Sequence, residues 1–316
     1  MDSAATSSHE EERKIYYDDG NLDLVVGGVC FRVYRGVLAQ HSPIFKDMFD
    51  LCVPSDNIAS TSKEPFVNGN PAIATVRLQD SARDWRHVLC ILPDAAEPDE
   101  LSLYPSFDQL SACVRLGHKY QMPAIYAPAM DYLKRRFAPT LDGWKKWTTS
   151  RGEPYTLPRC TPAHAIGVVN LARLTGEHAL LPLALLGCAQ LGCKQLTDGF
   201  AYGDGQRETL SAEDAMLCME SVSRIAFYGA GHTLNLVQQK YQCRNRLGKS
   251  NGVVCRDTAA ELIISMQLDA YLRRVAYPTP FVRPDPEQAL CESCLVNLDN
   301  LNSRALKKLS EIFRVG

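Results

Sequence analysis

Two cysteines near the C-terminus have the spacing at which thiolates bind a metal ion. Cys291 and Cys294 are separated by two residues, and such a pair can hold one Zn²⁺ ion from a single turn. A tetrahedral site needs two more ligands, for which the chain offers Cys243, Cys255 and His232. One C-x-x-C motif without a second matched pair also fits two reduced thiols near the last helix. The reduced pair is the favoured interpretation, and zinc at Cys291 and Cys294 is the alternative.

The other residues with catalytic potential fit structural roles. His118 lies beside the apolar positions of a predicted helix, and His41 directly precedes a helix start, where hydrogen-bonded structural histidines are common. The glycine pairs lack the strand-to-helix context of a phosphate-binding loop, and the sequence contains no H-E-x-x-H or G-x-S-x-G motif. The sequence therefore predicts that the chain is not an enzyme and uses no cofactor.

Twelve cysteines are scattered along the whole chain rather than concentrated in a small disulfide-rich domain. Several lie within apolar helical patterns, which indicates reduced, buried thiols. The examples are Cys90, Cys113, Cys188 and Cys218.

The stretch from Asn21 to Phe49 predicts the first secondary-structure elements of the chain. Apolar residues alternate with others on both sides of Gly27-Gly28, which has the composition of a two-residue hairpin turn. Helical spacing follows, and Ser42-Pro43 then suits an N-cap and a first-turn proline. The buried face of this second short helix is predicted to consist of Ile44, Phe45, Met48 and Phe49.

This stretch resembles the opening of the BTB/POZ domain, in which an aspartate-led strand and a hairpin precede F-x-V-x-R-x-x-L-A and H-S-x-x-F-x-x-M-F segments. The matching residues are Asp23, Phe31, Val33, Arg35, Leu38, Ala39, His41, Ser42, Phe45, Met48 and Phe49. The resemblance continues with a third strand at Val76 and Leu78, a helix over 81–92 and a closing helical pair over 107–137. Segments 110–137 and 165–185 look like the large BTB group of mushroom-forming fungi.

The resemblance implies an α+β fold, mostly α, with an N-terminal BTB/POZ fold in which helices clad a small sheet. An all-helical C-terminal region is expected to follow. We predict a disordered tail over 1–16, the BTB/POZ domain over 17–137, a linker over 138–161 and a helical domain over 162–316. The polar run Cys52 to Pro71 is predicted to be a mobile surface loop. Three prolines in Leu92 to Ser106 argue against a regular strand there.

Helix boundaries can be predicted from local chemistry. Ser106 and Gln109 have the spacing of a capping box at the start of a helix that is expected to lie across the sheet. Met122-Pro123 then marks a break before a second helix. Further helices are predicted over 163–175, 180–196, 211–228, 258–275 and 298–313. The last of these has an apolar face of Leu298, Leu301, Ala305, Leu309 and Ile312.

Composition limits the classes of partner. The 316 residues carry 34 basic and 36 acidic side chains, so a net charge of −2 provides no field that favours nucleic acid or an anionic membrane. No apolar stretch approaches the length that crosses a bilayer, and the first residues are polar and acidic rather than signal-like. We therefore expect no nucleic-acid or membrane partner and an intracellular location, in the cytoplasm, the nucleus or both.

These observations favour a non-enzymatic protein-protein interaction module. BTB domains are commonly self-associating, so the resemblance implies a homodimer or recruitment of a protein partner through exposed helix and strand edges. One version is a substrate adaptor that binds the cullin scaffold of a ubiquitin ligase. The alternatives are a zinc-binding metalloprotein and a transcriptional regulator, with the BTB domain as a tether.

Overall fold

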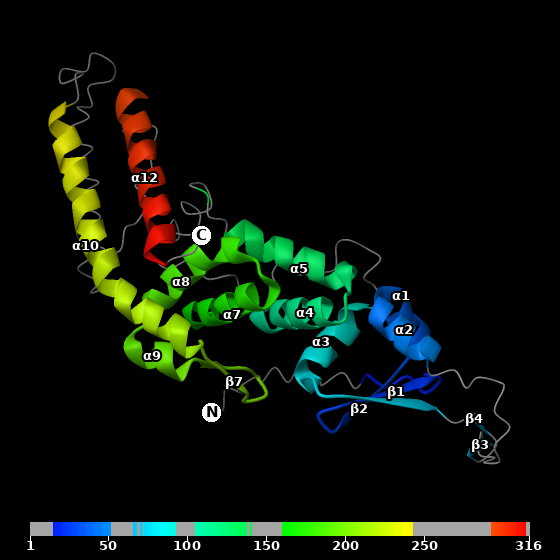
Figure 1. Cartoon of the computed structure of the whole chain (residues 1–316). Helices are drawn as coiled ribbons and strands as arrows, with labels where there is room; N and C mark the ends of the chain where they lie inside the picture. Colours follow the sequence, from blue (N-terminus) through cyan, green and yellow to red (C-terminus); the bar gives the residue numbers. More distant parts are fainter. Residues whose placement is uncertain are drawn as a thin grey trace, which may run out of the picture. The chain divides into compact units, whose positions relative to one another are not determined.

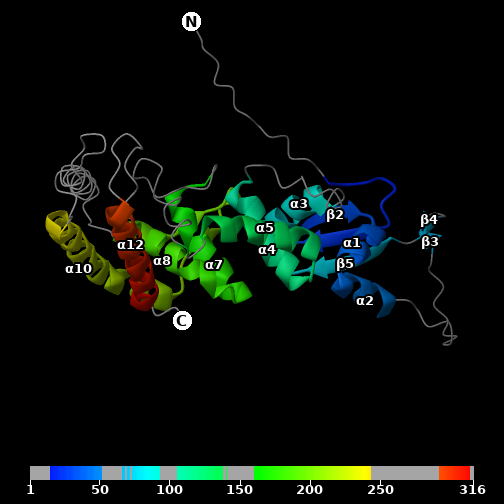
Figure 2. The ribbon, with the colours of Figure 1, turned by 90° about the horizontal axis from the view of Figure 1, so that it is seen from above.

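The computed structural model describes residues 15–51, 66–67, 70–71, 73–92, 105–137, 140, 160–242 and 292–313. Over these ranges the fold is α+β and mostly helical (Figure 1, Figure 2). Contacts divide the chain into two compact units, Met1–Ala129 and Met130–Gly316, and this division falls inside helix α5 (Pro123–Arg136). Four predicted features lie wholly or mostly outside the described residues: the N-terminal tail, segment 93–104, the linker and the helix over 258–275.

The first unit contains a three-stranded sheet in the order β2-β1-β5. β1 (Leu22–Val26) pairs antiparallel with β2 (Val29–Val33) and parallel with β5 (Ala74–Leu78). Gly27 and Gly28 form the predicted turn with φ of +54° and +84°, values that a two-residue hairpin needs and glycine adopts without strain. The predicted hairpin and third strand are therefore confirmed.

Two short helices follow the hairpin. α1 (Arg35–His41) leads into α2 (Pro43–Leu51), and the Phe45 amide donates a hydrogen bond to the Ser42 hydroxyl at 3.1 Å. This bond confirms the predicted N-cap. The predicted buried face is confirmed in part: Phe45 and Phe49 are buried, whereas Ile44 and Met48 are only half-buried.

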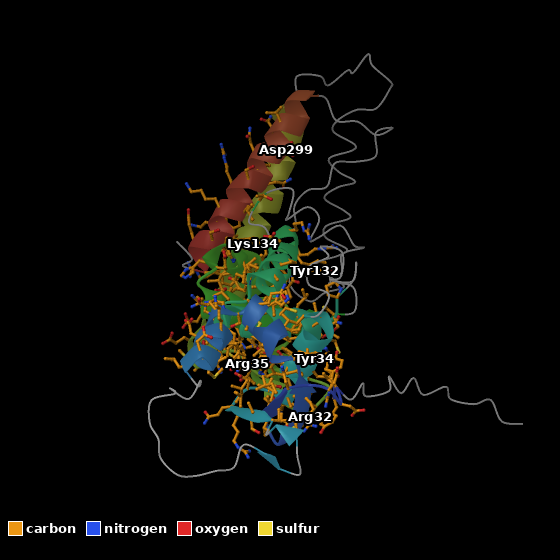
Figure 3. The ribbon with its side chains drawn as sticks, turned by 90° about the vertical axis from the view of Figure 1, so that its right-hand side faces the viewer. Arg32, Tyr34, Arg35, Tyr132, Lys134 and Asp299 are labelled. Atoms are coloured by element: carbon orange, nitrogen blue, oxygen red, sulfur yellow. The ribbon has the colours of Figure 1, made fainter. Side chains whose placement is uncertain are left out.

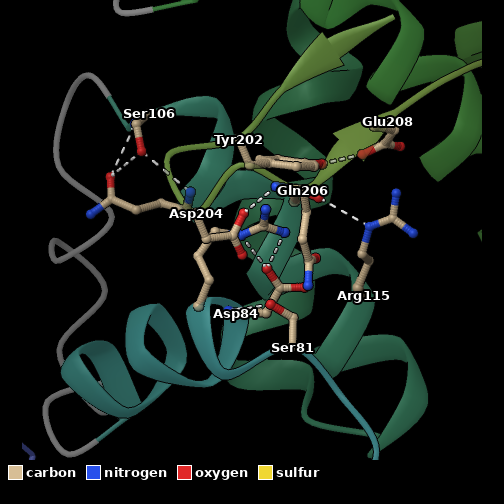
Figure 4. Close-up of polar contacts among 11 residues, drawn as sticks. Ser81, Asp84, Ser106, Arg115, Tyr202, Asp204, Gln206 and Glu208 are labelled. Carbon is tan, nitrogen blue, oxygen red and sulfur yellow. Dashed lines mark hydrogen bonds and ion pairs between the residues drawn. The ribbon is translucent and has the colours of Figure 1, made fainter. Parts of the chain in front are cut away.

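Two capped helices complete the core of the first unit. Ser81 caps α3 (Ala82–Ile91), and Ser106 and Gln109 form the predicted capping box of α4 (Phe107–Lys119) (Figure 4). The expectation that α4 lies across the sheet is wrong, because α4 packs chiefly against α3. An aromatic cluster of Phe45, Trp85 and Tyr120, with ring centroids 4.9 to 5.7 Å apart, joins α2, α3 and the end of α4.

The turn from α4 to α5 has a strained residue. Gln121 adopts a φ of +51°, and the Met122 amide donates to the Gly117 carbonyl at 2.8 Å, as in a Schellman helix end. A side chain at Gly117 would place its Cβ 2.9 Å from Cβ of Tyr126, so glycine permits the close approach of α4 and α5. The predicted helical hairpin is confirmed.

The run Cys52 to Pro71 contains a short pair of strands. β3 (Phe66–Val67) and β4 (Asn70–Pro71) pair antiparallel, so the end of the run that was predicted to be a mobile surface loop contains a short hairpin. Two-residue strands are too short to produce an alternating pattern. Residues 52–65 lie outside the described ranges.

The second unit is built around a buried helix. The 3-10 turn η2 (Pro162–His164) precedes α7 (Ala165–Thr175), the turn η3 (His178–Leu180) and α8 (Leu181–Ala189), after which α9 (Cys193–Asp198) follows. Every residue of α8 is buried, which agrees with an apolar sequence on all sides. α7, α10 and α12 pack around it.

A small hairpin interrupts the predicted all-helical region, and that prediction is therefore wrong here. β6 (Phe200–Ala201) pairs antiparallel with β7 (Arg207–Glu208). The Tyr202 hydroxyl donates to the Glu208 carboxylate within the hairpin (Figure 4). The Asn170 amide of α7 donates to the same carboxylate at 2.8 Å, and this bond fastens the hairpin to α7. Gly199 at φ +68° lies so close to β7 that a Cβ would come within 2.0 Å of the Glu208 carbonyl oxygen.

Two long helices complete the second unit. α10 (Ala212–Gln242) passes through Gly229 to Gly231, where the prediction ended it, and α12 (Glu292–Ile312) begins six residues before its predicted start (298 − 292). α10 packs against α12, which explains why the glycines do not end it. The predicted apolar face of α12 is buried at Leu301, Ala305, Leu309 and Ile312. Across the described helices, none combines the length and apolar character that a bilayer crossing requires.

Candidate interaction surface

The apolar residues of the predicted BTB motif belong to the core. Phe31 and Val33 of β2 face inward with Leu38 of α1 and with Phe45 and Phe49 of α2, and all five are buried. Met48 is half-buried. These side chains fix the positions of the hairpin and the two short helices. Their role is therefore to hold the shape of the unit, and they are not themselves available to a partner.

The charged residues of the motif connect neighbouring elements. Asp23 of β1 accepts two hydrogen bonds from Arg32 of β2, at 2.8 and 3.0 Å, which is the bidentate geometry that arginine and carboxylate prefer. Arg35 donates to the Phe49 carbonyl at 2.8 Å, and its guanidinium lies 4.9 Å from the centre of the Phe49 ring. Arg35 therefore ties the start of α1 to the C-terminal half of α2.

His41 and Ser42 lie at the junction of α1 and α2. Burial lowers the pKa of His41 below its usual value, so the imidazole is neutral at pH 7. The Ser42 hydroxyl donates to the Tyr120 carbonyl at 2.6 Å while it accepts from Phe45, and the whole group is buried. Ser42 thus joins α2 to the end of α4.

A polar cluster around Asp80 holds the third strand, α3 and α4 together. Its carboxylate accepts hydrogen bonds from Lys119 and Tyr120, both at 2.5 Å, and from the Trp85 indole at 3.3 Å. Burial alone would raise the pKa of Asp80, but the three donors outweigh burial and lower it. Sequence reasoning missed this cluster because no local pattern links residues about 40 positions apart.

One exposed edge of the sheet concentrates tyrosine and arginine. Tyr16 forms a single parallel bridge to Arg32, the Tyr17 amide donates to the Arg32 carbonyl at 3.0 Å, and the Tyr17 and Tyr34 rings lie 5.1 Å apart. The Arg32 guanidinium lies 4.6 Å from the centre of the Tyr16 ring. Arg32 and Tyr34 lie close together on this side of the unit (Figure 3). We call Tyr16, Tyr17, Arg32 and Tyr34 the tyrosine edge.

The tyrosine edge is accessible and ordered. Tyr16 and Tyr17 are each 39% exposed. The Tyr34 hydroxyl donates to Asp19 at 2.5 Å, and this bond raises the pKa of Tyr34. Sequence reasoning did not select these tyrosines, because they lie at the start of the strand pattern, although a Tyr-Tyr pair before an aspartate-rich turn is visible in the sequence.

The opposite edge of the sheet is formed by β5. Among the described residues β1 is its only strand partner, and its outer edge is open. Ala74, Thr75 and Arg77 are exposed, and Val76 and Leu78 are half-buried. A five-residue edge strand that carries an arginine is short and charged, which are two features that limit uncontrolled strand pairing.

The predicted thiol pair, Cys291 and Cys294, belongs to the second unit. Cys291 is outside the described residues, and half-buried Cys294 lies in the first turn of α12, so the favoured reduced pair and the alternative zinc site both stay predictions. No group of three His, Cys, Asp or Glu side chains with metal-binding geometry occurs within the described ranges. Cys113, Cys188 and Cys218 are buried as predicted, and burial raises the pKa of Cys113 to about 12. The prediction is wrong for Cys90, which is exposed because it faces outward from the end of α3.

Comparison of the chain with protein-family models, with curated proteins and with solved structures found no match.

Proposed function

We propose that residues 17–137 form a BTB/POZ domain and that the chain is a non-enzymatic protein-interaction module. The observation that carries this proposal is the order of elements in the first unit. Apart from the short β3–β4 pair that precedes β5, a hairpin is followed by two short helices, a sheet strand that returns beside β1, one helix and then a helical pair. This order agrees with the one that the BTB resemblance implies, and the motif residues occupy core and connecting positions in it.

The proposed interaction is association between two copies of the chain through the tyrosine edge. Tyrosine and arginine are enriched in protein interfaces because each combines a large contact area with hydrogen-bonding groups. The ring contact of Tyr17 with Tyr34 and the stacking of Arg32 on Tyr16 keep these side chains ordered before binding. Such pre-organisation lowers the entropic cost of association.

Two differently tagged full-length chains, expressed together, test this proposal. Capture of one tag is expected to retain the other chain. Replacing Tyr16→Ser and Tyr17→Ser in both copies is expected to abolish that retention. Leu174→Ser in α7 is a matched control, because Leu174 is 46% exposed and lies outside the tyrosine edge. Equal retention by the double variant and the control would contradict the proposal.

The same experiment addresses recruitment of a different protein. If the double variant still retains its own copy but loses a cullin scaffold that the wild-type chain captures, the tyrosine edge binds that scaffold. This outcome would replace self-association by the adaptor function.

A further inference from the structure

Two buried thiols on neighbouring helices of the second unit lie in contact. Cys188 belongs to α8 and Cys218 to α10, two helices that pack against each other (Figure 1), and both side chains are fully buried. The Cys218 thiol donates a weak hydrogen bond to the Leu185 carbonyl at 3.9 Å, and Leu185 precedes Cys188 by about one turn of α8. The two thiols also form a hydrogen bond with each other. Cys218 therefore lies directly against the turn of α8 that carries Cys188.

This contact brings the two sulfur atoms close to the geometry of a disulfide. A disulfide needs sulfur atoms about 2.05 Å apart and Cα atoms within about 7 Å of each other. Since the thiols already touch across two packed helices, closing the bond requires rotation of the two side chains. It does not require a new arrangement of α8 and α10.

The surroundings of the pair favour a product without charge. Every residue of α8 is buried, and burial together with the bond to Cys218 raises the pKa of the Cys188 thiol. A metal complex would need both sulfurs as thiolates, whereas a disulfide is neutral. The raised pKa also slows oxidation, because the thiolate is the reactive form. The pair is therefore suited to a small uncharged oxidant and should react more slowly than an exposed thiol such as Cys30.

We infer that Cys188 and Cys218 form an oxidisable dithiol whose disulfide covalently joins α10 to α8. The oxidant that fits the buried pair is hydrogen peroxide. One thiol gives up its proton, its sulfur takes a hydroxyl group as the O–O bond breaks, and the other oxygen leaves as water. The second thiol then displaces that hydroxyl group as a second water and forms the S–S bond. In total the two thiols lose two protons and two electrons, and the peroxide is reduced to two waters.

The disulfide would act on the stability of the second unit. The chain between the two cysteines contains α9 and the β6–β7 hairpin, so the bond closes a loop that includes both. Closing a loop lowers the entropy of the unfolded chain, and the oxidised unit is therefore expected to resist unfolding better than the reduced one. This inference goes beyond the proposed function, because the tyrosine edge belongs to the first unit and takes no part in it.

Peptide mapping without reduction tests the inference on the full-length wild-type chain. After treatment with hydrogen peroxide and alkylation of the remaining thiols, digestion is expected to release two peptides joined through Cys188 and Cys218. The melting temperature is expected to rise by roughly 5–10 °C and to return to its starting value on reduction. Cys188→Ala should remove this rise. Cys113→Ala is the matched control and should keep it, because Cys113 is an equally buried thiol of the first unit.

Each of the other outcomes overturns the inference. If Cys188 and Cys218 are unmodified when exposed Cys30 has reacted completely, the oxidant does not convert the pair. If either cysteine is joined to a third one, or ends as a sulfinic acid, the two thiols are not each other's partners. A joined pair with an unchanged or lowered melting temperature would refute the stabilising role. The peptide map needs no variant that has to fold, and self-association through the tyrosine edge does not affect it, so failure here is distinguishable from failure of the proposed function.

Discussion

The Ser42 hydroxyl donates a hydrogen bond to the carbonyl of Tyr120, 78 residues further along the chain, at 2.6 Å in the interior of the first unit. The same oxygen caps α2 by accepting from the Phe45 amide. One side chain thus satisfies two buried backbone groups at the ends of two different helices. The relationship makes Ser42 structurally important for the unit that we propose as the interaction domain.

Replacement of Ser42 by alanine is expected to lower the free energy of unfolding by about 2–4 kcal/mol. The variant loses an N-cap and leaves a buried carbonyl without its donor. Ser81→Ala is the matched control, because Ser81 caps α3 only through the Asp84 amide at 3.4 Å and should cost about 1 kcal/mol. Urea unfolding of both variants measures the difference. Equal losses would show that the bond to Tyr120 does not stabilise the fold.

Asp80→Asn is expected to lower the free energy of unfolding by roughly 1–3 kcal/mol at pH 6. The loss should lie in the lower part of this range, because Lys119 is partly exposed and solvent weakens its ion pair with Asp80. The wild-type pKa of Asp80 is lowered in the folded state. Its stabilisation is therefore complete above the pKa of an unfolded aspartate, about 3.9, and is lost as the pH falls through the folded value. Urea unfolding at pH 6 and pH 3 should show a smaller difference between wild type and variant at pH 3. A constant difference would contradict the charge argument.

Gln121→Gly is expected to stabilise the chain, by about 0.5–1 kcal/mol. Gln121 occupies a left-handed conformation, with φ +51°, which glycine adopts without steric cost. Gln40→Gly is the control in the opposite direction, since Gln40 is exposed within α1 and should cost about 1 kcal/mol there. Thermal melts of the two variants should therefore shift to opposite sides of wild type. A lowered melting temperature for Gln121→Gly would be inconsistent with the helix end described for α4.

Gly199→Ala is expected to cost about 3 kcal/mol or more and to release the β6–β7 hairpin from α7. Gly199 combines φ +68° with ψ −150°, and an added Cβ would meet the Glu208 carbonyl oxygen at 2.0 Å. Gly203→Ala, where no atom lies within 4 Å of the added carbon, should stay within about 0.5 kcal/mol of wild type. Hydrogen exchange at the Tyr202 amide, which bonds to the Gln206 carbonyl at 2.8 Å, reports the hairpin directly. Unchanged protection there in Gly199→Ala would refute the close contact.

Local chemistry was sufficient to predict the hairpin at Gly27-Gly28, the cap at Ser42 and the capping box at Ser106. In each case the interacting groups lie within a few residues of one another. The Asp80 cluster and the bond from Ser42 to Tyr120 could not be predicted, because they depend on how distant helices pack. Packing also overrode propensity in α10, where Gly229 and Gly231 did not end the helix beside α12.

Candidate surfaces were harder to predict than the core. A buried helix or strand face repeats apolar residues at a fixed interval in the sequence, whereas an exposed sheet edge requires no such repeat. The residues of the tyrosine edge therefore could not be recognised from apolar periodicity. The β6–β7 hairpin was missed for a related reason. Its strands of two residues are too short to alternate, and Gly199 and Gly205 were the remaining signals of tight turns.

Light scattering of the full-length chain at high micromolar concentration tests the central claim most directly, because it measures self-association without any partner present. The account predicts the mass of two chains, and the mass of one chain when Tyr16→Ser and Tyr17→Ser are added. A strictly monomeric wild-type chain under these conditions would contradict the proposal that the N-terminal unit is a self-associating interaction domain.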